Sequence, residues 1–188
     1  MKKLIFVALL QVVLVFPAVA QDANQAATKD PLSAMLRGFF GRSRENLLHS
    51  AEKVPENLYS MRPGQQSEVR TFSQIVGHLA NFNYFYCANA KEEKNPQAET
   101  DFEKVTAKAD LIKALNGAMS YCEAVYNSLT DKSAMQPINI TLDNGKPLRT
   151  LRVRTLIQNI SHNNEHYGNL VTYMRIKSIV PPSSEPRK

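Results

Sequence analysis

Four segments of this chain repeat apolar residues at intervals of three and four positions, the spacing that gives an α-helix one apolar face. These segments run over residues 31–54, 71–94, 109–129 and 150–179. The sequence has no comparable series of alternating segments that would build a sheet of several strands. Four long amphipathic helices in one domain predict an all-α fold, a four-helix bundle.

Local residues indicate where some of these helices begin. Pro31 suits the first turn of a helix, with Asp30 as its cap. Thr71 and Gln74 have the spacing of a capping box, which predicts the start of the second helix. Between the third and fourth helices, residues 138–142 alternate, and a turn signal, Asp-Asn-Gly, follows. A short hairpin is therefore allowed before the last helix.

The first twenty residues have the order of a secretory signal peptide. Lys2 and Lys3 begin this segment, and an apolar run follows over residues 4–16, with Gln11 as its one polar residue. Residues 18–20 (Ala-Val-Ala) form a small-x-small cleavage site. The apolar run is shorter than the roughly 20 residues that a transmembrane helix needs. We expect cleavage after Ala20, export to the periplasm or the medium, and no stable membrane insertion afterwards. The alternative is an uncleaved membrane anchor.

The mature chain then suits one domain. Residues 21–30 are polar and predict a flexible linker, residues 31–182 form the bundle, and residues 183–188 predict a disordered tail. Without the two lysines of the leader, 21 basic and 17 acidic side chains leave a net charge of +4. Since Lys/Arg runs with interleaved aromatics are absent from the sequence, we do not expect nucleic-acid binding.

Two of the four histidines, His162 and His166, lie four positions apart in the last predicted helix. Such residues project from one helix face and can share a metal ion. At roughly 100° per residue, their face lies about 130° from the centre of the apolar stripe of that helix. The strip around them mixes polar and apolar residues, which predicts a pocket wall or a subunit contact.

The other two histidines differ in their surroundings. His78 lies at the edge of the apolar stripe of the second helix, with Phe82 and Phe85 as helical neighbours. Three histidines from two helices, with no evident fourth protein ligand, would leave coordination positions open, as a catalytic metal site needs. His49 lies opposite the inward face of the first helix, so we expect it in solvent.

The segment from His162 to His166 also has the H-x-x-E-H order of inverted zinc proteases. Those enzymes take a further carboxylate ligand from well downstream. The only acid after His166 is Glu185, close to the end of the sequence. We therefore reject a protease of that class.

Three separated runs form a joint pattern: YSMRP at 59–63, VRTFSQIVGHLANFNYFYC at 69–87 and HNNEHYGNLVTYMR at 162–175. Together they resemble the DinB-like (YfiT-like) superfamily over about residues 31–182. The resemblance implies a left-handed bundle with up-down-down-up connectivity that is often a homodimer. It also implies a divalent metal ion, zinc or nickel, on one histidine of the second helix and two of the last. Those positions correspond to His78, His162 and His166.

The implied connectivity makes the second and third helices parallel, which bears on the two cysteines. Cys87 and Cys122 then lie at similar heights, both on apolar faces. A disulfide between the two helices is one hypothesis, and two buried free thiols are the other.

Family members with assigned activities include thiol-dependent S-transferases and a maleylpyruvate isomerase, and others are called metal-dependent hydrolases. We therefore expect a metal-dependent enzyme, a hydrolase or a thiol or group transferase, that acts on a small molecule. Glu165, Tyr167 and Asn159 are candidates for its catalytic base because of their proximity to the histidines alone. The alternatives are a non-catalytic module that binds metal or ligand, and a structural homodimer whose metal site is vestigial.

Overall fold

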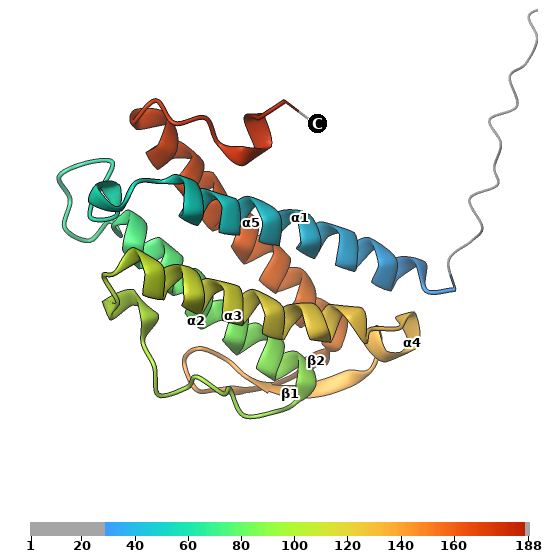
Figure 1. The fold of residues 1–188 in the computed structure, drawn as a ribbon. Coiled ribbons are helices and arrows are strands. Elements are labelled where there is room, and N and C mark those ends of the chain that lie inside the picture. Colours follow the sequence, from blue (N-terminus) through green and yellow to red (C-terminus); the bar gives the residue numbers. More distant parts are fainter. Residues whose placement is uncertain (1–28, 187–188) are drawn as a thin grey trace, which may run out of the picture.

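Four long helices lie side by side in the computed structural model, which describes residues 29–186 (Figure 1). They are α1 (Pro31–Lys53), α2 (Phe72–Lys91), α3 (Lys108–Asn127) and α5 (Arg152–Ile176). The predicted all-α fold is confirmed. The signal peptide and residues 21–28 of the linker fall outside the described residues.

Shorter elements connect the long helices. One turn of helix, α4, and two strands separate α3 from α5. Among the described residues, one 3-10 helix precedes α2, a second precedes α3 and a third follows α5. Their bounds are α4 (Asp131–Ala134), β1 (Pro137–Thr141), β2 (Pro147–Leu151), η1 (Glu56–Leu58), η2 (Phe102–Lys104) and η3 (Pro182–Ser184).

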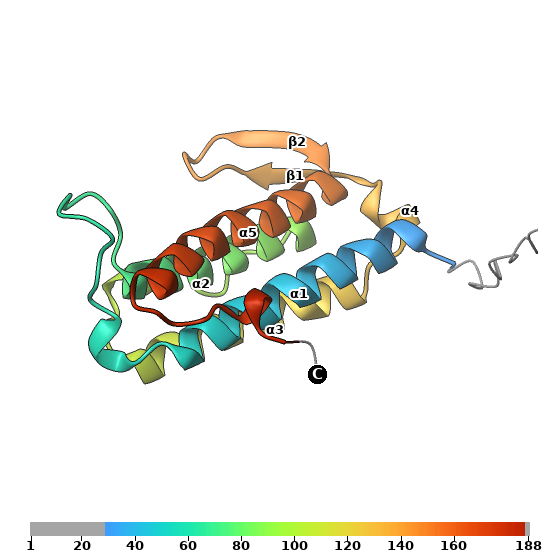
Figure 2. The ribbon, with the colours of Figure 1, turned by 90° about the horizontal axis from the view of Figure 1, so that it is seen from above.

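Figures 1 and 2 show the direction of each long helix. In both views α1 and α5 run from right to left, whereas α2 and α3 run from left to right. The inner faces of the four helices share one apolar core, whose largest fully buried side chains include Tyr126, Phe72 and Leu47. None of the described helices combines the length and the apolar character that spanning a membrane requires.

The N-termini of α1 and α2 are capped in different ways. The predicted capping box of α2 is present, with Thr71 Oγ1 accepting from Gln74 N at 3.2 Å and Gln74 Oε1 accepting from Thr71 N at 2.8 Å. Asp30 is the N-cap residue of α1 as predicted, but its carboxylate makes no capping bond to α1 and accepts from Asp131 N. The Asp131 carboxylate in turn accepts from Ser33 N at 2.8 Å, so the turn α4 caps α1 from a distant part of the chain.

The allowed hairpin before the last helix is present. Strands β1 and β2 are antiparallel, and Ile138 and Ile140 of β1 point inward and are buried. Because β2 extends to Leu151, α5 begins at Arg152 rather than at residue 150 as predicted. Pairing with β1 holds the first predicted turn of the helix in an extended form.

Ser183 and Glu185, which fall in the predicted disordered tail, contact α5 and α1. Residues 182–184 form η3, and Ser183 N donates to the Tyr167 hydroxyl at 2.9 Å. Glu185 pairs with Lys53 on α1. These polar contacts hold residues 183–185 against α1 and α5, and because their partners are distant in sequence, composition does not indicate them.

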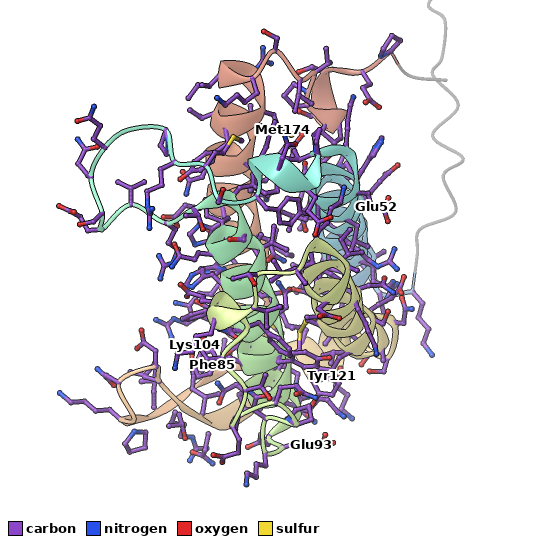
Figure 3. The ribbon with its side chains drawn as sticks, turned by 60° about the vertical axis from the view of Figure 1, so that its left-hand side comes forward. Glu52, Phe85, Glu93, Lys104, Tyr121 and Met174 are labelled. Atoms are coloured by element: carbon purple, nitrogen blue, oxygen red, sulfur yellow. A yellow bond between two sulfur atoms is a disulfide. The ribbon has the colours of Figure 1, made fainter. Side chains whose placement is uncertain are left out.

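Cys87 of α2 and Cys122 of α3 form a disulfide, with their Cα atoms 5.3 Å apart (Figure 3). Both residues are buried in the core. Since α2 and α3 run in the same direction, positions similarly far along each helix lie side by side. The structure therefore agrees with the disulfide hypothesis rather than with two buried free thiols.

Candidate metal centre

Helices α2 and α5 bring three histidines together inside the bundle. His78 lies in the second turn of α2, and His162 and His166 lie in the middle of α5. One potential ligand nitrogen from each residue lies within 4.8 Å of the others. The Nε2 atoms of His78 and His162 are 3.1 Å apart. The structure thus joins all three residues that the sequence singled out.

The outer ring nitrogens of two of these histidines have polar partners. His78 Nδ1 lies 2.7 Å from Oε1 of Glu103, and His166 Nδ1 lies 3.2 Å from the side-chain amide of Asn169. Among the described residues, Nδ1 of His162 has no hydrogen-bond partner, although it is buried.

Burial and mutual repulsion keep the three imidazoles neutral. Burial, together with the neighbouring His166 and His78, lowers the pKa of His162 to about 3. Burial and repulsion from His78 lower the pKa of His166 to about 4. Burial also lowers the pKa of His78, although the hydrogen bond to Glu103 opposes that effect. Metal ions bind the neutral form of imidazole, so the three ligands are in the binding form at neutral pH.

The donor set fits a small divalent ion. Nitrogen ligands lie about 2.0 Å from zinc, which places tetrahedral ligands about 3.3 Å from one another. The His78–His162 separation of 3.1 Å is close to that value, and the three ligand atoms all lie within 4.8 Å of one another. Three imidazoles suit zinc and nickel, and they leave coordination positions for water or substrate.

Aromatic rings cover one side of the histidine cluster. The Phe82 ring stacks on His162 with centroids 4.8 Å apart and lies 4.4 Å from the ring of His78. Tyr86 meets His162 edge to face at 5.6 Å. These rings are a hydrophobic wall that limits water on that side.

The other side of the cluster reaches a surface pocket of about 310 Å³. His166 lines this pocket together with Arg70, Asn169 and Tyr173. Tyr173 closes part of it by donating from its hydroxyl to the backbone oxygen of Arg70. The predicted pocket wall therefore exists around His166.

The orientation predicted for the α5 histidines was wrong. His166 is buried, with 8% of its surface exposed, and His162 is half-buried, so their face does belong to the bundle interior. On a helical wheel, only apolar residues mark the inward face of a helix. The interior face of α5 also carries Asn159 and Asn163, which are fully buried and hydrogen-bonded to Asn83 of α2.

The three candidate bases lie outside the cluster or have other partners. Asn159 contacts Asn83 and the Tyr126 hydroxyl in the core. Tyr167 accepts from Ser183 N, and Glu165 is exposed on α5. His49 is also exposed, as predicted.

Two residues beside the site went unnoticed in the sequence. Glu103 belongs to η2, in the connection between α2 and α3, and Arg70 directly precedes Thr71, the N-cap residue of α2. The Glu103 carboxylate accepts from Arg70 Nε at 2.9 Å and from Nη2 at 3.3 Å. Although burial acts in the opposite direction, hydrogen bonds from Arg70 and His78 hold the pKa of Glu103 below its usual value. An acid in an irregular segment gives no periodic signal.

Solved structures share this fold. A DinB-like protein from Bacillus subtilis is 20% identical, with a TM-score of 0.59 and an alignment that covers 81% of this chain and 99% of that chain. A DinB-like protein from Bacillus cereus is 17% identical, with a TM-score of 0.60 and coverage of 77% and 94%. At such identities the likeness shows the fold alone.

A mycothiol-dependent maleylpyruvate isomerase is a more distant structural neighbour, 10% identical with a TM-score of 0.55. That alignment covers 73% of this chain and 60% of the isomerase chain. No curated protein matches the sequence.

The sequence also matches the family model of the DinB superfamily over residues 40–170, which include all three histidines. The match spans well over half of the sequence and agrees with the resemblance of its three motif segments. The chain therefore belongs to the DinB superfamily.

Proposed function

We propose that this protein is an exported metal-dependent enzyme that acts on a small molecule by hydrolysis or group transfer. Its divalent ion, zinc or nickel, is held by His78, His162 and His166. The observation that carries the proposal is the convergence of three neutral imidazoles beside a pocket large enough for a small molecule. Held in this way, a divalent ion lowers the pKa of a bound water or thiol and polarises a carbonyl group.

The surrounding residues support chemistry at this position. Phe82 and Tyr86 limit water on one side, so charges that develop in the site are poorly screened. The pocket on the other side offers Arg70, Asn169 and Tyr173 to orient a substrate. No acid other than Glu103 contacts the histidine cluster among the described residues, so we assign no catalytic base to a side chain.

Group transfer from a thiol is one arm of the proposal. A structural neighbour is a mycothiol-dependent isomerase, which makes a thiol cosubstrate worth testing here. An exported enzyme acts outside the cytosol, so in this proposal the nucleophile is water or a thiol that is available there. Hydrolysis of an ester or amide is the other arm.

Metal analysis of protein purified without chelator is the first test. Wild-type protein is expected to retain close to one equivalent of a transition metal, and the His162→Ala variant much less. The exposed His49→Ala variant is the matched control and should retain metal as wild type does. Wild type with less than a tenth of an equivalent after growth in replete medium would overturn the proposal.

Turnover is the second test. The loaded protein is screened against thiol, ester and amide substrates, with His78→Ala and His49→Ala in parallel. Loss of turnover in His78→Ala alone supports metal-dependent catalysis. Stoichiometric metal without turnover of any substrate class favours the non-catalytic binding module.

A further inference from the structure

The 3-10 helix η2 lies directly against α2, close to His78 (Figure 3, Lys104). Gly77 makes this approach possible, because a Cβ atom at that position would lie 2.7 Å from the backbone nitrogen of Glu103. Any other side chain at position 77 would push η2 away. The glycine next to the ligand histidine is thus required by the neighbouring segment.

Side chains of α2 and η2 then fix the position of the turn. Asn81 Oδ1 accepts from Phe102 N at 3.0 Å, and Asn81 Nδ2 donates to Asp101 at 3.1 Å. The Asp101 carboxylate also accepts from Glu103 N at 3.1 Å. The backbone of Glu103 is therefore anchored to the same helix that carries His78.

From this position, one carboxylate bridges two residues of the site. Glu103 Oε1 lies 2.7 Å from His78 Nδ1, while both of its oxygens accept from Arg70. The Glu103 side chain is 24% exposed and the Arg70 side chain 43%. A surface ion pair with Arg70 alone would need neither the close contact of η2 with Gly77 nor a contact with a buried ring.

We propose that Glu103 is a positioning residue for the metal site. It holds the proton of His78 on Nδ1, so that the lone pair of Nε2 points toward His162 and His166. Its second contact fixes Arg70 at the wall of the pocket, which links the geometry of the metal ligands to that of the substrate pocket. This inference rests on the metal site of the proposed function.

The chemical basis is the coupling between the two nitrogens of an imidazole. A carboxylate on one nitrogen sets the tautomer, orients the ring and raises the basicity of the other nitrogen. Loss of such a partner typically weakens metal binding by about 10–100-fold. The same effect is expected here because His78 is one of only three protein ligands in the cluster.

The tautomer of His78 in metal-free protein is the first test. Long-range ¹⁵N NMR distinguishes a protonated Nδ1 from a protonated Nε2, and a His78→Gln variant assigns the resonances. Wild type and Glu103→Gln, whose side-chain oxygen can still accept from Nδ1–H, should show the Nδ1–H tautomer. Glu103→Ala should show a mixture or the other tautomer. An identical tautomer in wild type and Glu103→Ala would overturn the inference.

Zinc affinity is the second test. Glu103→Ala should bind zinc about 10–100-fold more weakly than wild type. Glu99→Ala, an exposed acid in the same connection, is the matched control and should bind as wild type does. Arg70→Ala separates the two contacts of Glu103, because it removes the ion pair and leaves the bond to His78. If Arg70→Ala weakens zinc binding as much as Glu103→Ala does, the effect comes from the ion pair and the inference fails.

The two tests separate this inference from the proposed function. If wild type binds no metal but its His78 tautomer depends on Glu103, the proposed metal-dependent enzyme is contradicted, whereas the positioning of His78 by Glu103 is supported. If wild type and Glu103→Ala bind metal equally tightly, the positioning role of Glu103 is contradicted, whereas the metal site itself is not.

Discussion

Asn83 on α2 and Asn163 on α5 hydrogen-bond to each other in both directions. Asn83 Nδ2 donates to Asn163 Oδ1 at 2.8 Å, and Asn163 Nδ2 donates to Asn83 Oδ1 at 3.0 Å. Both residues are fully buried, and Asn163 directly follows His162 in the chain. The pair therefore fixes the register of α2 against α5 at the height of the metal ligands.

Replacing Asn83 with leucine should lower the free energy of unfolding by about 1–3 kcal/mol, because Asn159 and Asn163 would keep buried amides without their partner. Urea denaturation of the metal-free protein measures the change. Asn164→Leu is the matched control, since Asn164 is exposed on α5 next to Asn163 and its replacement should change stability little. An Asn83→Leu protein as stable as wild type would mean that the amide pair does not hold the helices in register.

Replacing Gly77 with alanine should also destabilise the fold. The new methyl group would overlap the backbone of η2, and overpacking of this kind typically costs about 1–3 kcal/mol. Metal affinity should fall together with stability, because η2 carries the Glu103 contact to His78.

The matched control for that variant is Gly168→Ala in α5. A Cβ atom at Gly168 meets nothing within 4 Å, and alanine is the better helix former by up to about 1 kcal/mol. This variant should therefore be as stable as wild type or more so. Equal destabilisation by both substitutions would show that close approach of η2 is not the reason for glycine at position 77.

Much of this fold was readable from the sequence because apolar periodicity reports packing directly. Each end of the four long helices was predicted to within three residues, and the start of α1 at Pro31 was predicted correctly. Helix ends depend on capping and on strand pairing, which explains why β2 displaced the start of α5.

The histidine cluster was also predicted, but the charged residues beside it were not. Spacing within α5 and the resemblance together selected the three ligands. Glu103 and Arg70 come from segments without periodicity, so only the folded chain places them beside His78. The face of α5 that carries the buried asparagines was wrongly predicted to lie away from the core. In a sequence, a buried polar residue whose partner is a distant side chain cannot be distinguished from a surface residue.

Loss of the Cys87–Cys122 disulfide should lower the free energy of unfolding by about 4 kcal/mol. The bridge joins residues 35 apart in sequence, and closing a loop of that length restricts the unfolded chain by about this amount. The comparison is a Cys87→Ala/Cys122→Ala double variant against the oxidised wild type in urea. Intact mass with and without reductant, after unfolding, provides the control. If the masses with and without reductant do not differ by two daltons, the disulfide is absent and this prediction fails.

The lowered histidine pKa values predict metal binding that resists mild acid. Protons compete with metal ions for imidazole nitrogens, so affinity falls as the pH drops below the pKa of the metal-free ligand. Three histidines with an ordinary pKa of about 6.5 would lose about 10³-fold in affinity between pH 7.5 and 5.5. Here the pKa of His162 is about 3 and that of His166 about 4, so these two remain neutral at pH 5.5.

We therefore expect zinc affinity to change by less than about tenfold between pH 7.5 and 5.5. Equilibrium dialysis with elemental analysis measures it without a chelator that itself titrates. The stability of the metal-free protein, unlike its zinc affinity, should fall as the pH drops below about 6.5. The histidines of the unfolded chain take up protons in that range whereas those of the folded site do not, and this difference favours the unfolded state. A steep loss of zinc affinity, with no loss of metal-free stability over the same range, would mean that the three imidazoles titrate as exposed groups and that the cluster is open to water.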